Sequence, residues 1–124
     1  AIKEIISTWQ GICEIDIDID EAMKKVVAKD SHLSMCVNEI VKEAISNAVR
    51  HGDARSAKVS LTSAVDGVID LTVKNDGFAP GFRTTKGLGT TLLDELTVFW
   101  SLDFDSATDE TVLSARLPFS RSQA

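Results

Sequence analysis

The sequence predicts an α/β fold, a two-layer sandwich in which helices cover one face of a mixed, mostly antiparallel sheet. Residues 37–51 place apolar side chains three or four positions apart, which is the spacing of a helix with one buried face. Residues 13–20 alternate apolar and acidic side chains, as in a half-buried strand. Asp66-Gly67 separates two further β-prone segments, which is a strong hairpin signal. Helices combined with antiparallel strands favour layers of this kind.

Length and composition indicate one globular domain. The chain has 124 residues, of which 44% are hydrophobic and 26% are charged, and a domain of this size can bury one core. The net charge of −6 argues against general nucleic-acid binding, because no basic stripe exists to neutralise phosphates. Any phosphate must therefore be held locally, by backbone amides and a few cations, with or without a metal ion. No apolar run is long enough to span a bilayer.

The two cysteines, Cys13 and Cys36, have no metal-ligand spacing. We expect them to be reduced, partly buried thiols of a cytosolic protein. A disulfide between them is the less favoured alternative.

The N-terminal part of the chain predicts two short helices around one strand. Residues 1–10 have helical spacing, and Gly11 is a natural stop. The strand at 13–19 has an acidic outer face, which indicates solvation, because side chains on one strand face do not enclose a metal ion. Asp20 can cap a short helix over residues 21–28.

A long helix follows, and it carries the most informative pattern of the chain. Ser31 or Ser34 can start it, it runs to about His51, and Gly52 and Asp53 end it. Beside its apolar stripe, a second stripe places a carboxylate, an amide, a guanidinium and an imidazole one turn apart. This second stripe consists of Glu39, Glu43, Asn47, Arg50 and His51. Asparagine is a weak helix former, so one inside this helix indicates a function of its own.

The C-terminal half predicts four strands and one more short helix. The expected elements are strands at 57–65 and 68–75, a loop at 78–86, a short helix after Gly87-Leu88-Gly89, and strands at 97–104 and 111–119. No repeat, low-complexity segment or linker interrupts this order, so residues 1–124 are expected to form a single domain.

Four polar or glycine-rich features occur in order along the chain. They are Glu43 and Asn47 on the long helix, Asn75-Asp76-Gly77 at a strand end, Gly87-Leu88-Gly89 before a helix, and Thr111 at a strand start. Each feature alone has a simple structural explanation, such as a solvated helix face or a turn. Their order and spacing together indicate a binding site.

With these motifs the chain resembles the ATP-binding catalytic domain of two-component sensor histidine kinases, within the group that includes gyrase, the Hsp90 chaperone and MutL. Residues 39–54 match the N-box of that family, residues 71–77 its first glycine box and residues 86–93 its second. Thr111 and the strand to Pro118 match its closing segment. The resemblance covers nearly the whole chain and is strongest to the short-lid subfamily of nitrate-sensor and lipid-fluidity-sensor kinases.

The resemblance implies the Bergerat ATP-binding fold and a phosphotransferase activity. The domain would bind ATP and Mg²⁺ and donate the γ-phosphate to a histidine on a linked dimerisation domain, and the parent kinase would signal to a response regulator. Only His32 and His51 are present, and neither lies in a phosphoacceptor motif. We therefore expect a cytoplasmic fragment of a longer, membrane-anchored kinase, without its acceptor domain and with little turnover by itself.

The resemblance also implies roles for residues of the long helix. Asn47 would supply an oxygen to Mg²⁺, and Glu43 would orient the nucleophile or act as a base. Arg50 would face the phosphates. His51 would either pack at the helix end or contact the nucleotide.

Further residues would bind the rest of the nucleotide. The backbone at Gly87-Leu88-Gly89 would approach the phosphates, and Lys86 would close over the γ-phosphate. The adenine pocket would comprise Asn75, Asp76, Gly77 and Thr111.

Three positions depart from the family pattern. Asn75 stands where the family has the aspartate that reads adenine, so either its side-chain oxygen accepts from the adenine amino group or a shifted backbone presents Asp76. Ala79 replaces the second glycine of the first glycine box. Glu110 replaces a glycine before Thr111, so the turn there must be built differently.

Two other functions remain open from the sequence. A stand-alone serine kinase of the anti-sigma-factor type would use the same fold. A degenerate module that binds no nucleotide, and acts only in protein interactions, is favoured by Asn75, Ala79 and Glu110.

Overall fold

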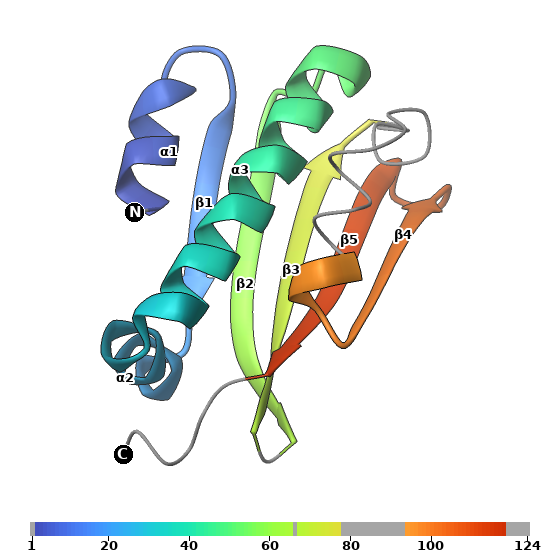
Figure 1. Cartoon of the computed structure of the whole chain (residues 1–124). Coiled ribbons are helices and arrows are strands. Elements are labelled where there is room, and N and C mark those ends of the chain that lie inside the picture. Colours follow the sequence, from blue (N-terminus) through green and yellow to red (C-terminus); the bar gives the residue numbers. More distant parts are fainter. Residues whose placement is uncertain (1, 66, 78–93, 119–124) are drawn as a thin grey trace.

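The computed structural model describes residues 2–65, 67–77 and 94–118. In chain order the elements are α1 (Ile2–Thr8), β1 (Glu14–Ile19), α2 (Glu21–Lys29), α3 (Ser31–Gly52), β2 (Ser56–Val65), β3 (Val68–Asp76), β4 (Phe99–Asp105) and β5 (Glu110–Pro118) (Figure 1). Residues 94–96 are also helical. The loop predicted at 78–86 and the glycine-rich start of the next helix lie outside the described residues.

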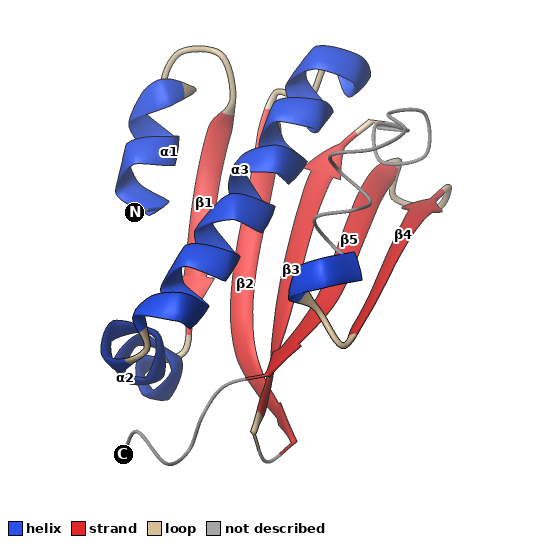
Figure 2. Cartoon of the chain, viewed as in Figure 1, coloured by secondary structure: helices blue, strands red, loops and turns tan. Residues whose placement is uncertain are grey.

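The strands form one five-stranded mixed sheet in the order β1-β2-β3-β5-β4. β1 pairs with β2 in parallel, and the other neighbouring pairs are antiparallel. Figure 2 shows α1, α2 and α3 on the same side of this sheet. The predicted two-layer α/β sandwich, with a mostly antiparallel sheet, is confirmed.

Strand order matters for the site because β5 lies between β3 and β4. The register pairs Asn75 of β3 with Thr111 of β5, and Thr111 in turn with Phe104 of β4. These three residues form one row across the helix-covered face of the sheet, since paired residues in neighbouring strands point to the same side.

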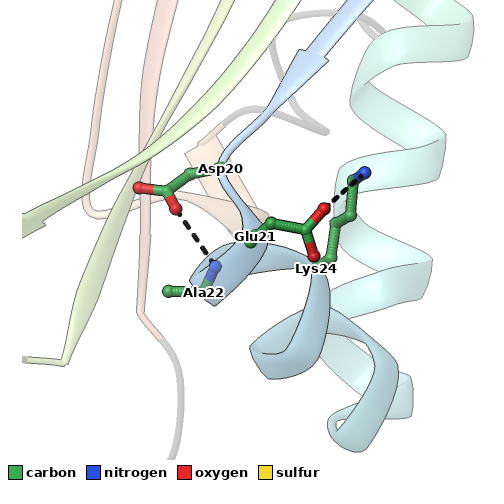
Figure 3. A network of polar contacts seen from close by, with 4 residues as sticks. All are labelled: Asp20, Glu21, Ala22 and Lys24. Atoms are coloured by element: carbon green, nitrogen blue, oxygen red, sulfur yellow. Dashed lines mark hydrogen bonds and ion pairs between the residues drawn. The ribbon is translucent and has the colours of Figure 1, made fainter.

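Aspartates start α2 and α3. The Asp20 carboxylate accepts a hydrogen bond from the Ala22 amide at 3.0 Å, as the sequence predicts, and Lys24 forms an exposed ion pair with Glu21 at 3.2 Å within the same turn (Figure 3). Capping satisfies an amide that has no partner inside the helix, so it fixes where α2 begins.

The long helix α3 begins with a different cap from the one predicted. Asp30 is the N-cap residue, and its carboxylate accepts from the Leu33 amide at 3.0 Å. The serines at 31 and 34 lie inside the helix, because the aspartate before them already occupies the capping geometry. Asp53 caps the other end with a left-handed φ of 52°, and its amide donates to the Ala48 carbonyl.

The core lies between α3 and the central strands. The apolar stripe predicted on the long helix is buried as expected and packs on the inward residues of β2, β3 and β5. The side chains below 2% exposure include Val37, Ile40, Val41, Ile45, Val59, Leu61, Ile69 and Leu71. Burial of this stripe fixes the rotation of α3, and so determines which of its polar side chains reach the sheet.

Both cysteines are free and buried, as expected for reduced thiols. Burial, together with the Asp76 carboxylate, raises the pKa of Cys13. Burial and Asp30 likewise raise the pKa of Cys36, whose Sγ lies 3.6 Å from His32 Nε2. Within the described part of the chain, no helix is both long enough and apolar enough to cross a membrane.

Candidate functional site

Asn47 is a buried polar residue at the boundary between α3 and the sheet. Its side chain is 2% exposed, and its Nδ2 donates to Glu43 Oε1 at 3.4 Å, one turn earlier in the helix. Its Oδ1 is buried and accepts no hydrogen bond from the described residues. An unsatisfied buried acceptor costs about 1–3 kcal/mol, so this oxygen is a candidate ligand atom.

Asn75 lies opposite Asn47, at the end of β3. Its side chain is 5% exposed, and its Nδ2 donates to the Asp76 carbonyl at 2.9 Å. Because Nδ2 is bound in this way, Oδ1 is the atom of this amide that could accept a hydrogen bond from a ligand. A small cavity joins these residues at the junction of α3 with β3, β5 and β4, and its lining is Ala44, Asn47, Val73, Asn75, Leu102, Thr111 and Leu113.

Thr111 connects the end of β3 to the turn before β5. Its hydroxyl donates to the Gly77 carbonyl at 2.7 Å, and the Gly77 amide donates to the Asp109 carbonyl at 2.8 Å. Asp109 has a left-handed φ of 59°. Asp109 therefore supplies the conformation that a glycine favours, one position before Glu110, which explains how the turn forms without the usual glycine.

The Asp76 carboxylate points away from this cavity, because neighbouring residues of a strand face opposite sides. Its Oδ1 accepts from the Arg55 and Ser56 amides, both at 2.9 Å, where β2 begins. Of the two alternatives for the end of β3, the structure thus brings Asn75, and not the Asp76 carboxylate, to the cavity beside Asn47.

Solved structures with this architecture include several kinase domains. The chain matches the ATP-binding domain of PrrB from Mycobacterium tuberculosis at 18% identity, with a TM-score of 0.60 and coverage of 96% of this chain and 94% of that one. The mycobacterial sensor histidine kinase MprB matches at 14% identity and a TM-score of 0.60, covering 95% and 94%. The chain has the fold of the histidine kinase ATP-binding domain.

Two further matches are to longer proteins, one by structure and one by sequence. The blue-light activated histidine kinase of Erythrobacter litoralis matches at 17% identity with a TM-score of 0.59, over 97% of this chain and 44% of that one. The nitrate/nitrite sensor protein NarQ of Escherichia coli is 26% identical over 81 residues, or 65% of this chain. The chain spans only 14% of the length of NarQ. No protein-family model matches it.

The structure gives less information on the other residues predicted from the histidine kinase motifs. Arg50 is exposed, and its Nε donates to the Ser46 carbonyl at 3.4 Å, within its own helix. His51 belongs to α3. Lys86, Gly87, Leu88 and Gly89 lie outside the described residues.

The donor set is compatible with Mg²⁺ held partly by a bound molecule. In the described part of the chain, no three His, Cys, Asp or Glu side chains cluster so that they could hold a metal. Mg²⁺ usually binds through one or two protein carboxylates together with substrate phosphates and waters, and here an amide oxygen would take the place of the carboxylate. The orphaned Asn47 Oδ1, with Glu43 fixing the amide, fits that mode.

Strand β4 contributes residues that the motifs do not include. Leu102 lines the cavity, and Phe104 follows it on the same face, 39% exposed. The alternation in the sequence indicates which face they share, but only the strand order places them beside Thr111.

The Asp76 contacts predict a change in acid stability. Burial alone raises the pKa of this carboxyl, but the hydrogen bonds from Ser56 and Arg55 outweigh it and hold the pKa below its ordinary value of 3.8. Ionised Asp76 therefore stabilises the fold above the ordinary value, and this contribution is lost as the pH falls through the folded-state pKa. We expect the free energy of unfolding to decrease less with falling pH in Asp76→Asn than in the wild type. Urea denaturation at a series of pH values from 6 downward measures this.

Asp18 is exposed on β1 and offers a control in which the same substitution is made away from the Arg55 and Ser56 amides. Asp18→Asn should leave the acid dependence of the wild type in place. If the free energy of unfolding depends on pH equally in the wild type, Asp76→Asn and Asp18→Asn, the role given to Asp76 is contradicted.

Proposed function

We propose that this chain is the ATP-binding domain of a sensor histidine kinase, which binds Mg²⁺-ATP and donates the γ-phosphate to a histidine on a linked dimerisation domain. The observation that carries the proposal is the orphaned Oδ1 of Asn47, in a cavity that ends at a second buried asparagine, Asn75. The described residues enclose only about 10 Å³ there, so the proposal depends on the chemistry of the lining, in which a few polar groups stand among apolar side chains as in small-molecule sites.

In this proposal Asn47 binds the phosphate end of the nucleotide through Mg²⁺, and Asn75 binds the adenine end. Asn47 Oδ1 would bind Mg²⁺, which neutralises the phosphate charge and polarises the bond to be broken. Asn75 Oδ1 would accept from the amino group of adenine, since Nδ2 is already bound to the Asp76 carbonyl. Thr111 supports this end by holding the Gly77 carbonyl.

Glu43 would act on the nucleophile. It is partly exposed and lies one turn before Asn47, to which it is hydrogen-bonded. Its carboxylate also lines a hollow between α1 and α3, and from there it would accept the proton of an incoming imidazole. Phosphoryl transfer depends mainly on positioning and charge neutralisation, so the isolated domain should bind nucleotide yet turn over slowly without the acceptor.

Calorimetric titration of the wild-type chain with a non-hydrolysable ATP analogue tests the proposal. We expect saturable binding in Mg²⁺ and clearly weaker binding in EDTA, because a metal bridge accounts for part of the phosphate affinity. Absence of heat at millimolar nucleotide would reject the proposal and favour the degenerate interaction module.

A further inference from the structure

Two exposed phenylalanines lie on β4 and differ in the face that they occupy. Phe104 is 39% exposed and pairs with Thr111, whereas Phe99 is 57% exposed and pairs with Arg116. Thr111 lines the small cavity beside α3, but Arg116 reaches Asp70 on the opposite, solvent-facing side of the sheet. Phe104 is thus an exposed aromatic residue on the face of the candidate site.

Phe104 ends the row that Asn75 begins. Asn75, Thr111 and Phe104 are consecutive partners across β3, β5 and β4, so two strand spacings, about 9–10 Å, separate the backbone of Asn75 from that of Phe104. The row therefore consists of the buried Asn75 amide, the Thr111 hydroxyl, which donates to the Gly77 carbonyl, and the aromatic ring of Phe104. A purine base needs the same elements, a polar partner for its edge and an apolar surface for its face.

We propose that Phe104 contacts the purine base of the bound nucleotide, packing its ring against the base while Asn75 Oδ1 accepts from the amino group. This inference rests on the proposed nucleotide function and adds a residue that lies in none of the sequence motifs. Phe104 compensates for the neutral Asn75, because contact with the aromatic ring adds affinity for the base without requiring a charge at its edge. Base–aromatic contacts of this kind do not depend on a charged partner.

Binding of two ligands to matched variants tests the proposal. Calorimetry would compare Mg²⁺-ATP with Mg²⁺-tripolyphosphate, which has no base, on the wild type, Phe104→Ala, Phe104→Leu, Phe104→Trp and the control Phe99→Ala. We expect Phe104→Ala to weaken ATP binding about tenfold and to leave tripolyphosphate binding unchanged. Phe104→Trp should retain ATP affinity, and Phe99→Ala should match the wild type with both ligands.

Phe104→Leu addresses folding, because it keeps apolar bulk on the edge strand while removing the aromatic ring. It should show a wild-type unfolding midpoint and weakened ATP binding. The proposal is overturned if ATP affinity in both Phe104→Ala and Phe104→Leu equals that of Phe99→Ala, or if tripolyphosphate binding falls as much as ATP binding. Failure of the wild type to bind ATP would reject the nucleotide function itself, and this inference with it.

Discussion

Replacing Asn47 by alanine should remove the Mg²⁺ dependence of ATP binding without unfolding the domain. The variant loses the only ligand atom that we assign to the metal, so ATP affinity in Mg²⁺ should fall at least about tenfold, toward the value measured in EDTA. Stability should change by less than about 1 kcal/mol, because the substitution deletes a weak 3.4 Å hydrogen bond but also removes an unsatisfied buried oxygen. Calorimetry with and without Mg²⁺, and thermal unfolding, measure the two effects.

The chain contains a matched control for this experiment. Asn38, earlier on α3, also has a buried Oδ1 with no hydrogen-bond partner in the described residues. It does not line the cavity of Asn47 but a hollow between α1 and α3, which Glu43 also lines. Asn38→Ala should therefore have a similar effect on stability and none on the Mg²⁺ dependence. Unchanged Mg²⁺ dependence in Asn47→Ala would show that the metal assignment is wrong.

The fold was largely predictable because its strongest signals are local. The 3.6-residue period of α3, the alternation of β1 and the turn at Gly67 each depend on a few neighbouring residues. The boundaries were less predictable. Asp30, and not one of the serines, caps α3. Capping depends on the backbone torsions of one residue. Where several capping residues follow one another, the sequence does not determine which of them adopts those torsions.

The candidate site was only partly predictable, since it combines segments that are distant in sequence. The spacing of Glu43 and Asn47 on one helix predicts that they are neighbours, and the structure shows their hydrogen bond. The contribution of β4 depends on β5 inserting between β3 and β4. No local pattern specifies that order, so Leu102 and Phe104 could not be assigned to the site from the sequence.

The end of β3 shows how one departure from the family pattern is accommodated. With Asn75 the buried position carries no charge, and its amide bonds to the neighbouring carbonyl instead of requiring a cation. The adjacent carboxylate, Asp76, serves the start of β2 on the other face. Asn75 therefore still presents a side-chain oxygen at the cavity, and this oxygen is the acceptor that we propose for adenine. For that reason we favour a binding domain over a degenerate module.

Replacing Glu43 by glutamine should abolish most phosphoryl transfer while preserving nucleotide binding. Glutamine keeps an oxygen that can accept from Asn47 Nδ2, so the metal ligand should remain oriented. It cannot take a proton from the attacking imidazole, and loss of a general base typically costs about 10²–10⁴-fold in rate. Single-turnover transfer from radiolabelled ATP to a dimerisation domain that carries an acceptor histidine would measure the rate, and calorimetry on the present chain would measure affinity.

Glu39, one turn earlier on the same helix face and exposed, is the matched control. Glu39→Gln removes the same charge at a greater distance from Asn47, so it separates a base from a general electrostatic effect. We expect near-wild-type transfer from this variant. If both variants slow transfer equally, the negative charge of the helix face matters rather than proton removal. If neither does, Glu43 is not the base.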